Sequence, residues 1–120
     1  MIKANKQILE SIDRLSVLFF SASWCEPCKK VKPYIEMLRL TDENYSTKVN
    51  IYYIDVDLEG ISLINDLEIK SIPSLYIYDP NSKLEKGKVI SGSDINKIKT
   101  HLLDNKIKVE DVLDFGDDFK

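Results

Sequence analysis

The residues of this sequence whose type and spacing indicate chemistry are two cysteines, Cys25 and Cys28, with Glu26 and Pro27 between them and Trp24 just before them. A spacing of three residues at the start of a helix brings the cysteines within one helical turn, close enough for a disulfide. The unpaired N–H groups and the positive end of the dipole at a helix N-terminus also favour a thiolate at Cys25. The segment therefore predicts a reactive thiol pair.

A strand and a helix must hold this pair in place. The short, mostly apolar run 16–22 predicts a strand that is buried on both faces. From residue 26 to about residue 40, apolar side chains recur at helical spacing and predict a long helix. Pro27 suits the first turn of that helix because it has no N–H to leave unpaired, whereas Pro33 lies inside the helix and is expected to kink it.

The rest of the chain alternates between strand and helix patterns. Asn5 is expected to cap a helix whose apolar residues extend to Leu15, and Ser93 to cap a helix near the end of the chain. The polar segment 41–48 predicts a loop, and Asp-Pro-Asn-Ser at 79–82 predicts a turn. Further strands are expected at 49–56, 74–78 and 88–91, and a short helix at 61–67. This order predicts an α/β fold with a late antiparallel hairpin.

Length and composition exclude several classes of protein. The chain has 120 residues, 43% hydrophobic and 31% charged, which predicts one folded domain. Seventeen basic against twenty acidic residues give a net charge of −3 and argue against a general nucleic-acid binder. Two cysteines and one histidine are too few for a four-ligand zinc site.

The sequence also bears on the compartment. The longest apolar runs fall far short of the roughly 20 residues that a membrane helix needs. Glu10, Asp13 and Arg14 interrupt the stretch that most resembles a signal peptide. We therefore expect a cytoplasmic protein, a compartment in which paired cysteines are more often catalytic than structural.

The chain resembles the thioredoxin family over residues 5 to about 105. The matches are Pro33, Gly92 and the segments Phe20-Ser21-Ala22-Ser23-Trp24-Cys25-Glu26-Pro27-Cys28-Lys29, Ile54-Asp55-Val56-Asp57 and Ile72-Pro73-Ser74. A lone C-x-x-C is a weak signal, but here Pro73 lies 45 residues beyond Cys28 and Gly92 a further 19. In C-x-x-C motifs of this kind, thioredoxin's own among them, the cysteine pKa is lowered to roughly 3.5–7.5.

The resemblance implies a thioredoxin fold, with a central mixed β-sheet of four or five strands flanked by about four helices. The thioredoxin domain would occupy residues 1–106. Residues 107–120 would form a short acidic and partly hydrophobic C-terminal tail that extends past the family's usual end. Segments of this composition are often disordered, or dock on a partner or on their own domain.

The resemblance also implies roles for the site residues. Cys25 would attack a substrate disulfide, and Cys28 would then attack Cys25 to release the reduced substrate. Pro73 would be cis and face the disulfide, and the backbone of Ile72 would pair with an extended substrate segment. The surface that contacts the substrate would comprise Trp24, Glu26, Pro27, Ile72, Pro73 and Gly92.

Structural roles are the alternative for three of these residues. Trp24 is then a core aromatic, Pro73 an ordinary edge-strand proline and Gly92 a turn glycine. Glu26 likewise is either a substitute base for Cys28 or a solvated carboxylate in the first turn of the helix.

Three positions depart from the family's pattern. Thioredoxins usually carry a buried Asp where this sequence has Phe19, and the Lys that accompanies the Asp is replaced by Tyr53. In the family that carboxylate is thought to help deprotonate the second cysteine, so release of the substrate here must use water or another base. Glu26 replaces the more common glycine, and its charge disfavours the Cys25 thiolate, while nearby lysines act in the opposite direction.

The resemblance therefore predicts a protein dithiol–disulfide oxidoreductase, a thioredoxin-like disulfide reductase with a part in electron transport and cell redox homeostasis. It would need no metal or bound organic cofactor, and a reductase or another dithiol protein would recharge it. We expect a monomer that acts on disulfide-containing proteins, without nucleic acid or membrane. Two alternatives stay open: an oxidase or isomerase in a disulfide relay, and a thioredoxin-fold binding module with incidental redox activity.

Overall fold

The computed structural model describes residues 1–44, 46–58, 65–80, 88–92 and 94–110. The strands in this part of the chain are β1 (Ile2–Lys3), β2 (Ser16–Ser21), β3 (Arg39–Asp42), β4 (Lys48–Asp55), β5 (Ser74–Tyr78), β6 (Lys88–Ser91) and β7 (Ile107–Glu110). The helices in the same part are α1 (Lys6–Glu10), α2 (Glu26–Met37) and α4 (Ile95–Asp104). The strands form one mixed sheet in the order β6-β5-β2-β4-β3-β7, and β1 pairs with β4 beside that path.

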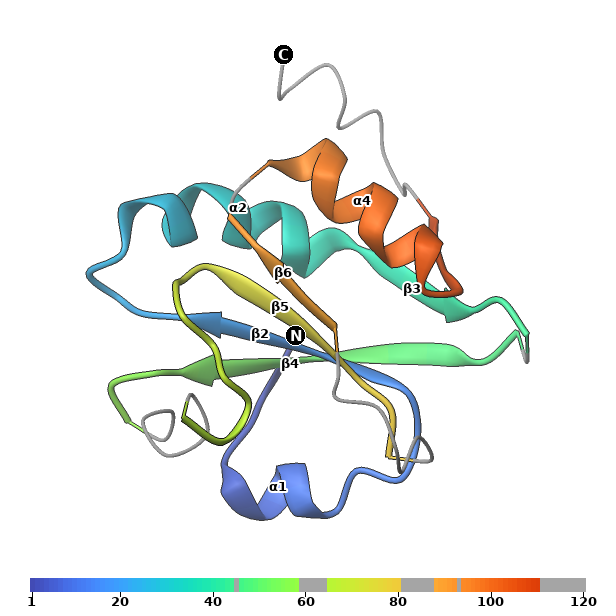
Figure 1. Ribbon diagram of the computed structural model, residues 1–120, viewed down its shortest axis with the longest axis horizontal. Helices are drawn as coiled ribbons and strands as arrows, with labels where there is room; N and C mark the ends of the chain where they lie inside the picture. Colours follow the sequence, from blue (N-terminus) through green and yellow to red (C-terminus); the bar gives the residue numbers. More distant parts are fainter. Residues whose placement is uncertain (45, 59–64, 81–87, 93, 111–120) are drawn as a thin grey trace.

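Strand β2 lies at the centre of the sheet and leads directly to the cysteines. It runs parallel to β4 and antiparallel to β5. All six of its residues are buried, as predicted for a strand that is covered on both faces. The antiparallel pairing of β5 with β6 confirms the predicted hairpin. Figure 1 shows that β2 and β4 end at the same edge of the molecule, where α2 begins.

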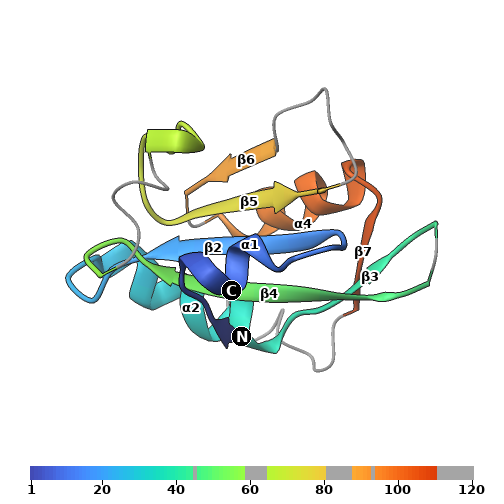
Figure 2. The same cartoon turned by 90° about the horizontal axis from the view of Figure 1, so that it is seen from below.

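The two faces of the sheet carry separate hydrophobic clusters. Val17 and Phe19 of β2 pack with buried residues of α2 and α4. Leu18 and Phe20 pack on the other face with Leu9 of α1 and with both cysteines. This alternation follows from the period of two along a strand. Figure 2 shows α1 on one side of the sheet and α2 and α4 on the other.

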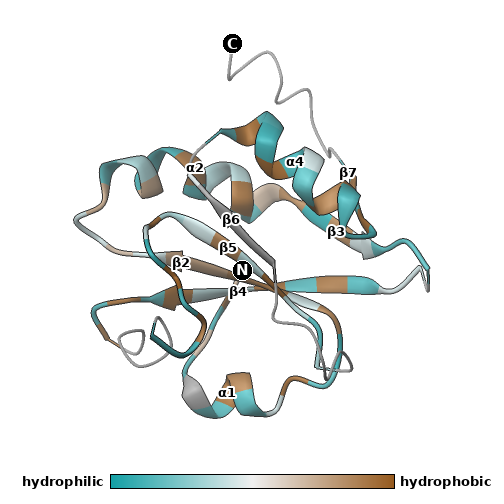
Figure 3. Ribbon diagram, in the orientation of Figure 1, coloured by the Kyte–Doolittle hydropathy of each residue, from teal (hydrophilic) through white to brown (hydrophobic). Residues whose placement is uncertain are grey.

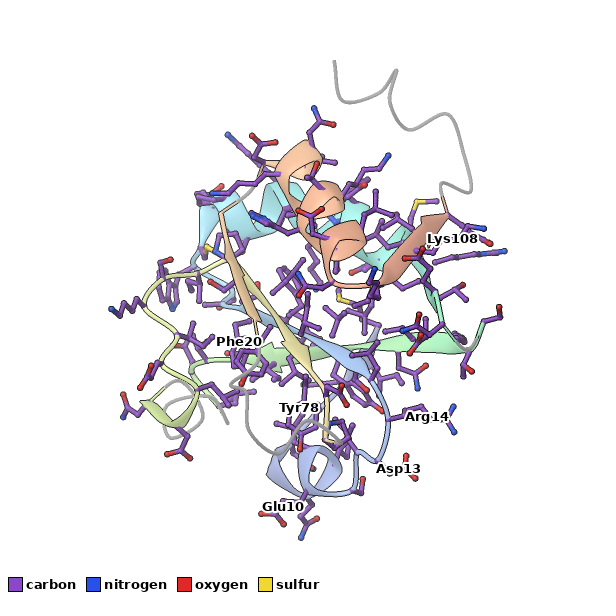
Figure 4. All side chains as sticks on the ribbon, turned by 45° about the vertical axis from the view of Figure 1, so that its right-hand side comes forward. Glu10, Asp13, Arg14, Phe20, Tyr78 and Lys108 are labelled. Atoms are coloured by element: carbon purple, nitrogen blue, oxygen red, sulfur yellow. A yellow bond between two sulfur atoms is a disulfide. The ribbon has the colours of Figure 1, made fainter. Side chains whose placement is uncertain are left out.

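Hydropathy follows the same division between inside and outside. In Figure 3 the hydrophobic colour concentrates on β2, whereas α4 is hydrophilic over much of its surface. Figure 4 shows the side chains of Glu10, Asp13 and Arg14 projecting outward at α1 and the segment after it. None of the helices described here has the length and hydropathy that a membrane crossing requires.

The segment after α2 differs from the sequence prediction. The helix ends at Met37 instead of near residue 40, and Arg39–Asp42 forms β3 where we expected first helix and then loop. Leu40 is buried and pairs with Val49 of β4. Leu38 and Leu40 stand two residues apart, a spacing that fits a strand as well as the end of a helical stripe. Backbone pairing with two neighbouring strands outweighs the weaker helical preference here.

The other helices differ from the predictions in smaller ways. Asn5 caps α1 as predicted, since its Oδ1 accepts the N–H of Ile8 at 2.9 Å, but α1 ends at Glu10. The cap of α4 is Asp94, which accepts the N–H of Lys97 at 3.2 Å. Ser93, most of the predicted helix at 61–67 and part of the predicted turn at 79–82 lie outside the described residues.

The sheet is larger than the four or five strands that the resemblance implied. Strands β2, β4, β5 and β6 form the expected central sheet, and β1, β3 and β7 extend it to seven strands among the described residues. β7 is made of the first four residues of the segment that we assigned to a C-terminal tail, and its Ile107 is fully buried. Residues 111–120 lie outside the described residues.

Candidate active site

Cys25 and Cys28 form a disulfide at the N-terminus of α2, with their Cα atoms 5.2 Å apart. Cys25 is the N-cap of the helix, and its Sγ accepts the backbone N–H of Cys28 at 3.2 Å. Pro27 lies in the first turn, as predicted. Because a helix N-terminus presents donors and partial positive charge, the same geometry favours a thiolate at Cys25 in the reduced protein.

The two cysteines differ slightly in burial, and Cys25 is the more exposed. Cys25 is 5% exposed and Cys28 is 1% exposed. Both belong to a hydrophobic cluster with Ile54, Val56 and Ile69. Cys25 is thus the more accessible residue of the pair, while Cys28 is enclosed by apolar side chains.

Trp24 lies on the surface, not in the core. Its side chain is 63% exposed, and its indole Nε1–H donates to Oδ2 of Asp57 at 2.9 Å. Asp57 follows β4, and its own N–H donates to Oδ1 of Asp55 at 2.9 Å. The loops after β2 and β4 are joined further by the N–H of Val56, which donates to the carbonyl of Ser21 at 3.0 Å.

The residues around Pro73 approach the same end of the sheet. The Ile72–Pro73 peptide bond is cis. Ile72 packs against the cluster that contains both cysteines, and the N–H of Gly92 donates to the carbonyl of Pro73 at 2.9 Å. Gly92 has a φ of 98°, and a Cβ built there meets nothing within 4 Å. The backbone conformation, not a lack of space, therefore favours glycine at this position.

Glu26 faces solvent and is paired on its own helix. Its Oε1 lies 3.0 Å from Nζ of Lys29, and both side chains are more than half exposed. An ion pair this exposed adds little stability. The pairing favours the role of a solvated first-turn carboxylate over that of a base for Cys28.

Phe19 and Tyr53 form an aromatic pair at the positions where the family usually has a buried Asp and an accompanying Lys. Phe19 is buried, and its ring centroid lies 6.0 Å from that of Tyr53. Nζ of Lys32 sits 4.8 Å from the centroid of the Tyr53 ring and 3.8 Å from Oε1 of Glu36. Lys32 is four residues after Cys28 and therefore lies on the same side of α2.

Two of these contacts were not predicted from the sequence. In the sequence, Asp57 stands out only as part of a segment that matches the family, and Lys32 belongs only to the group of lysines near the cysteines. The hydrogen bond from Trp24 joins residues 33 positions apart, and Tyr53 lies on a different element from Lys32. Local patterns carry no signal for such contacts. Within the described residues, no group of three or more His, Cys, Asp or Glu side chains could hold a metal ion.

The sheet order, the parallel pairing of β2 with β4 and the cysteine pair at the start of α2 define a protein of the thioredoxin fold. A family model described as Thioredoxin matches residues 3–104, and the chain belongs to the thioredoxin family. This confirms the family that the sequence resemblance indicated.

Individual relatives agree with this assignment. The chain is 31% identical to human thioredoxin over 88 residues, which cover 72% of this chain and 75% of that protein. It is also 31% identical to mitochondrial thioredoxin O1 of Arabidopsis thaliana over 106 residues, 82% of this chain and 51% of that protein. For mitochondrial thioredoxin O of Oryza sativa the covered share is 45%. The chain thus spans about half the length of these two plant relatives.

Solved structures show the same fold. Thioredoxin of Malassezia sympodialis superposes with a TM-score of 0.67 at 21% identity, covering 88% of this chain and 89% of that one. Thioredoxin O1 of Arabidopsis thaliana in its oxidised state gives a TM-score of 0.60 at 28% identity, covering 86% and 93%.

Proposed function

We propose that this chain is a protein dithiol–disulfide oxidoreductase that reduces disulfides in other proteins through Cys25 and Cys28. The observation that carries the proposal is the Cys25–Cys28 disulfide at the N-terminus of α2, in a chain of the thioredoxin family. The N–H of Cys28 already points at Sγ of Cys25, where it would stabilise the nucleophilic thiolate.

The reaction consists of two thiol–disulfide exchanges. The Cys25 thiolate attacks one sulfur of the substrate disulfide, that bond breaks, and the other substrate sulfur leaves as a thiolate that takes a proton from water. Cys28 then loses its proton, its thiolate attacks Sγ of Cys25, and the intermolecular bond breaks to release the second substrate thiolate. Two electrons have passed to the substrate, and the Cys25–Cys28 disulfide remains.

The proton of Cys28 has to leave an apolar environment. Cys28 is enclosed by a hydrophobic cluster, Phe19 stands where a carboxylate is usual, and Glu26 is paired with Lys29 at the surface. We therefore assign this proton to water. The two sulfur atoms carry the whole electron transfer, so the reaction requires no metal or organic cofactor.

The substrate would lie against the Trp-Cys-Glu-Pro-Cys motif and the segment around Pro73. The backbone of Ile72 would pair with an extended substrate strand, with Trp24 and Gly92 beside it. A reductase or another dithiol protein would recharge the disulfide. We also propose that the protein acts as a monomer in the cytoplasm, which size-exclusion chromatography and the location of a fluorescent fusion would test.

Replacing the nucleophile tests the proposal directly. With dithiothreitol as the recharging dithiol, we expect the protein to reduce a disulfide-containing protein substrate and Cys25→Ser to have no activity above background. Ser23→Ala, an exposed neighbour, is the matched control and keeps its activity. Turnover by Cys25→Ser at the rate of the unmodified chain would overturn the assignment.

The direction of electron flow is read from the reduction potential. Trp24 is the only tryptophan, so its fluorescence reports the state of the adjacent disulfide in defined thiol buffers. A reductase requires a potential near or below roughly −250 mV. A value near roughly −180 mV or above would instead indicate an oxidase or isomerase.

A further inference from the structure

Two large apolar side chains on the surface, Trp24 and Leu58, are strongly exposed, and Trp24 directly precedes Cys25. Leu58 is 69% exposed and Trp24 is 63% exposed, the highest values among the large hydrophobic residues that the structure describes. A single exposed leucine needs no explanation. Here, however, both residues adjoin Asp57, one through a side-chain hydrogen bond and the other through the chain.

Asp57 connects the two residues. Its carboxylate accepts the Trp24 indole N–H at 2.9 Å, and Leu58 is the next residue. The 2.9 Å hydrogen bond, the length of the Asp57 side chain and one Cα–Cα step of about 3.8 Å together put the indole nitrogen within roughly 10 Å of the Leu58 Cα. The N–H of Leu58 donates to the carbonyl of Asp55 at 3.2 Å, so the turn that presents Leu58 is itself hydrogen-bonded.

A substrate bonded to Cys25 would lie next to Trp24. In the mixed disulfide its sulfur is bonded to Sγ of Cys25, which directly follows Trp24 in the chain. An extended substrate advances about 3.3 Å per residue. Two or three residues therefore span about 7–10 Å, the same scale as the separation between the Trp24 indole and Leu58.

We propose that Leu58 and Trp24 form one apolar contact, the Trp24–Leu58 patch, that selects disulfides with a large apolar side chain two or three residues from the attacked cysteine. This inference rests on the proposed function and names its substrate class. Burial of the substrate side chain against Leu58 removes apolar surface from water. The Asp57 carboxylate between the two residues disfavours an acidic substrate residue at the same place.

The test compares two disulfide-linked peptide dimers that differ only in Leu or Ser at the second and third positions from cysteine. The reduced protein is mixed with each peptide, and the single-turnover rate constants are measured. We expect the unmodified chain to prefer the Leu peptide about fivefold, which corresponds to about 1 kcal/mol. Leu58→Ser should bring this ratio close to one, and Leu58→Met should retain it.

Leu103→Ser is the matched control, because Leu103 is 49% exposed but lies on α4. It should leave the ratio unchanged. An equal ratio in the unmodified chain and Leu58→Ser, or an equal loss in Leu103→Ser, would overturn the role of Leu58 while leaving the proposed function intact. If the unmodified chain reduces neither peptide nor a small aromatic disulfide, the proposed function fails, and this inference fails with it.

Discussion

Phe19 and Tyr53 are partners across the parallel strands β2 and β4, with ring centroids 6.0 Å apart and ring planes inclined at 60°. The family's usual residues at these positions are an Asp and a Lys. A buried carboxylate is costly to desolvate, so an apolar ring at position 19 should be neutral or stabilising for the fold. Phe19 in place of Asp thus removes a base near the second cysteine, while the two aromatic rings still pack across the sheet.

A carboxylate introduced at position 19 tests how the aromatic ring affects stability and substrate release. We expect Phe19→Asp to lower the free energy of unfolding by at least about 3 kcal/mol, since loss of a buried Phe ring alone costs about 3–5 kcal/mol. Burial raises the pKa of the introduced carboxyl above its value in the unfolded chain. The folded state then binds the proton more tightly, so stability falls further as pH rises above about 4.

Urea unfolding at several pH values checks this expectation. Phe19→Asn is the control, because it introduces a polar group of similar size that does not titrate. The same pH dependence in both variants would show that the introduced carboxyl is not buried. In stopped-flow experiments Phe19→Asp should also release the substrate from the mixed disulfide faster. An unchanged release rate would show that water deprotonates Cys28 fast enough without a nearby carboxylate.

The cation above Tyr53 gives a second prediction. Nζ of Lys32 lies 4.8 Å from the ring centroid and 3.8 Å from Oε1 of Glu36. A double-mutant cycle of Lys32→Met and Tyr53→Leu should give a coupling free energy of about 0.5–1 kcal/mol, the range for exposed cation–π pairs. Denaturant midpoints at constant m-value provide the measurement.

Two further variants separate the ring from the charge. Tyr53→Phe should retain the coupling, because the ring and not the hydroxyl attracts the ammonium. Lys30→Met, at an exposed position on the same helix, should show no coupling to Tyr53→Leu. An equal coupling free energy in the cycle of Lys30→Met and Tyr53→Leu would assign the effect to the general positive charge of α2.

What the sequence could predict was largely local. The apolar run before the cysteines and the proline after Cys25 lie within a few residues of what they determine, and both β2 and the start of α2 were correct. Strand β3 was missed because its apolar spacing also fits the end of a helix and because all four of its residues pair with distant β7, where Arg39 pairs with Glu110. No short window of sequence contains both strands.

The site was predicted to a similar extent and for the same reason. The cysteine pair follows from adjacent residues, whereas the hydrogen bond from Trp24 to Asp57 depends on β2 lying parallel to β4. The N-cap of α4 is one residue later than predicted, because Ser93 and Asp94 are both residue types that favour the N-cap position. Propensity alone does not choose between such neighbours.

Removal of the second cysteine gives a third prediction. Cys28→Ser keeps the nucleophile but lacks the thiolate that would attack Sγ of Cys25, so the mixed disulfide with the substrate should accumulate. Non-reducing electrophoresis and intact mass would detect one covalent adduct per chain. Cys25→Ser is the control and should form no such adduct. Equal adduct from both variants would mean that Cys28 attacks the substrate as readily as Cys25, against the order that their exposure suggests.

The hydrogen bond between Trp24 and Asp57 gives the fourth prediction. Asp57→Ala removes the acceptor 2.9 Å from the indole Nε1, and the freed side chain should change its orientation. Because the indole is exposed, water replaces the lost partner, and the free energy of unfolding should fall by no more than about 1 kcal/mol. The emission of Trp24, the only tryptophan, should nevertheless change clearly. Asp57→Asn keeps an acceptor oxygen and should preserve both the emission and the rate of disulfide reduction. If Asp57→Ala and Asp57→Asn gave the same spectrum and the same rate, the hydrogen bond would have no part in holding Trp24 beside Cys25.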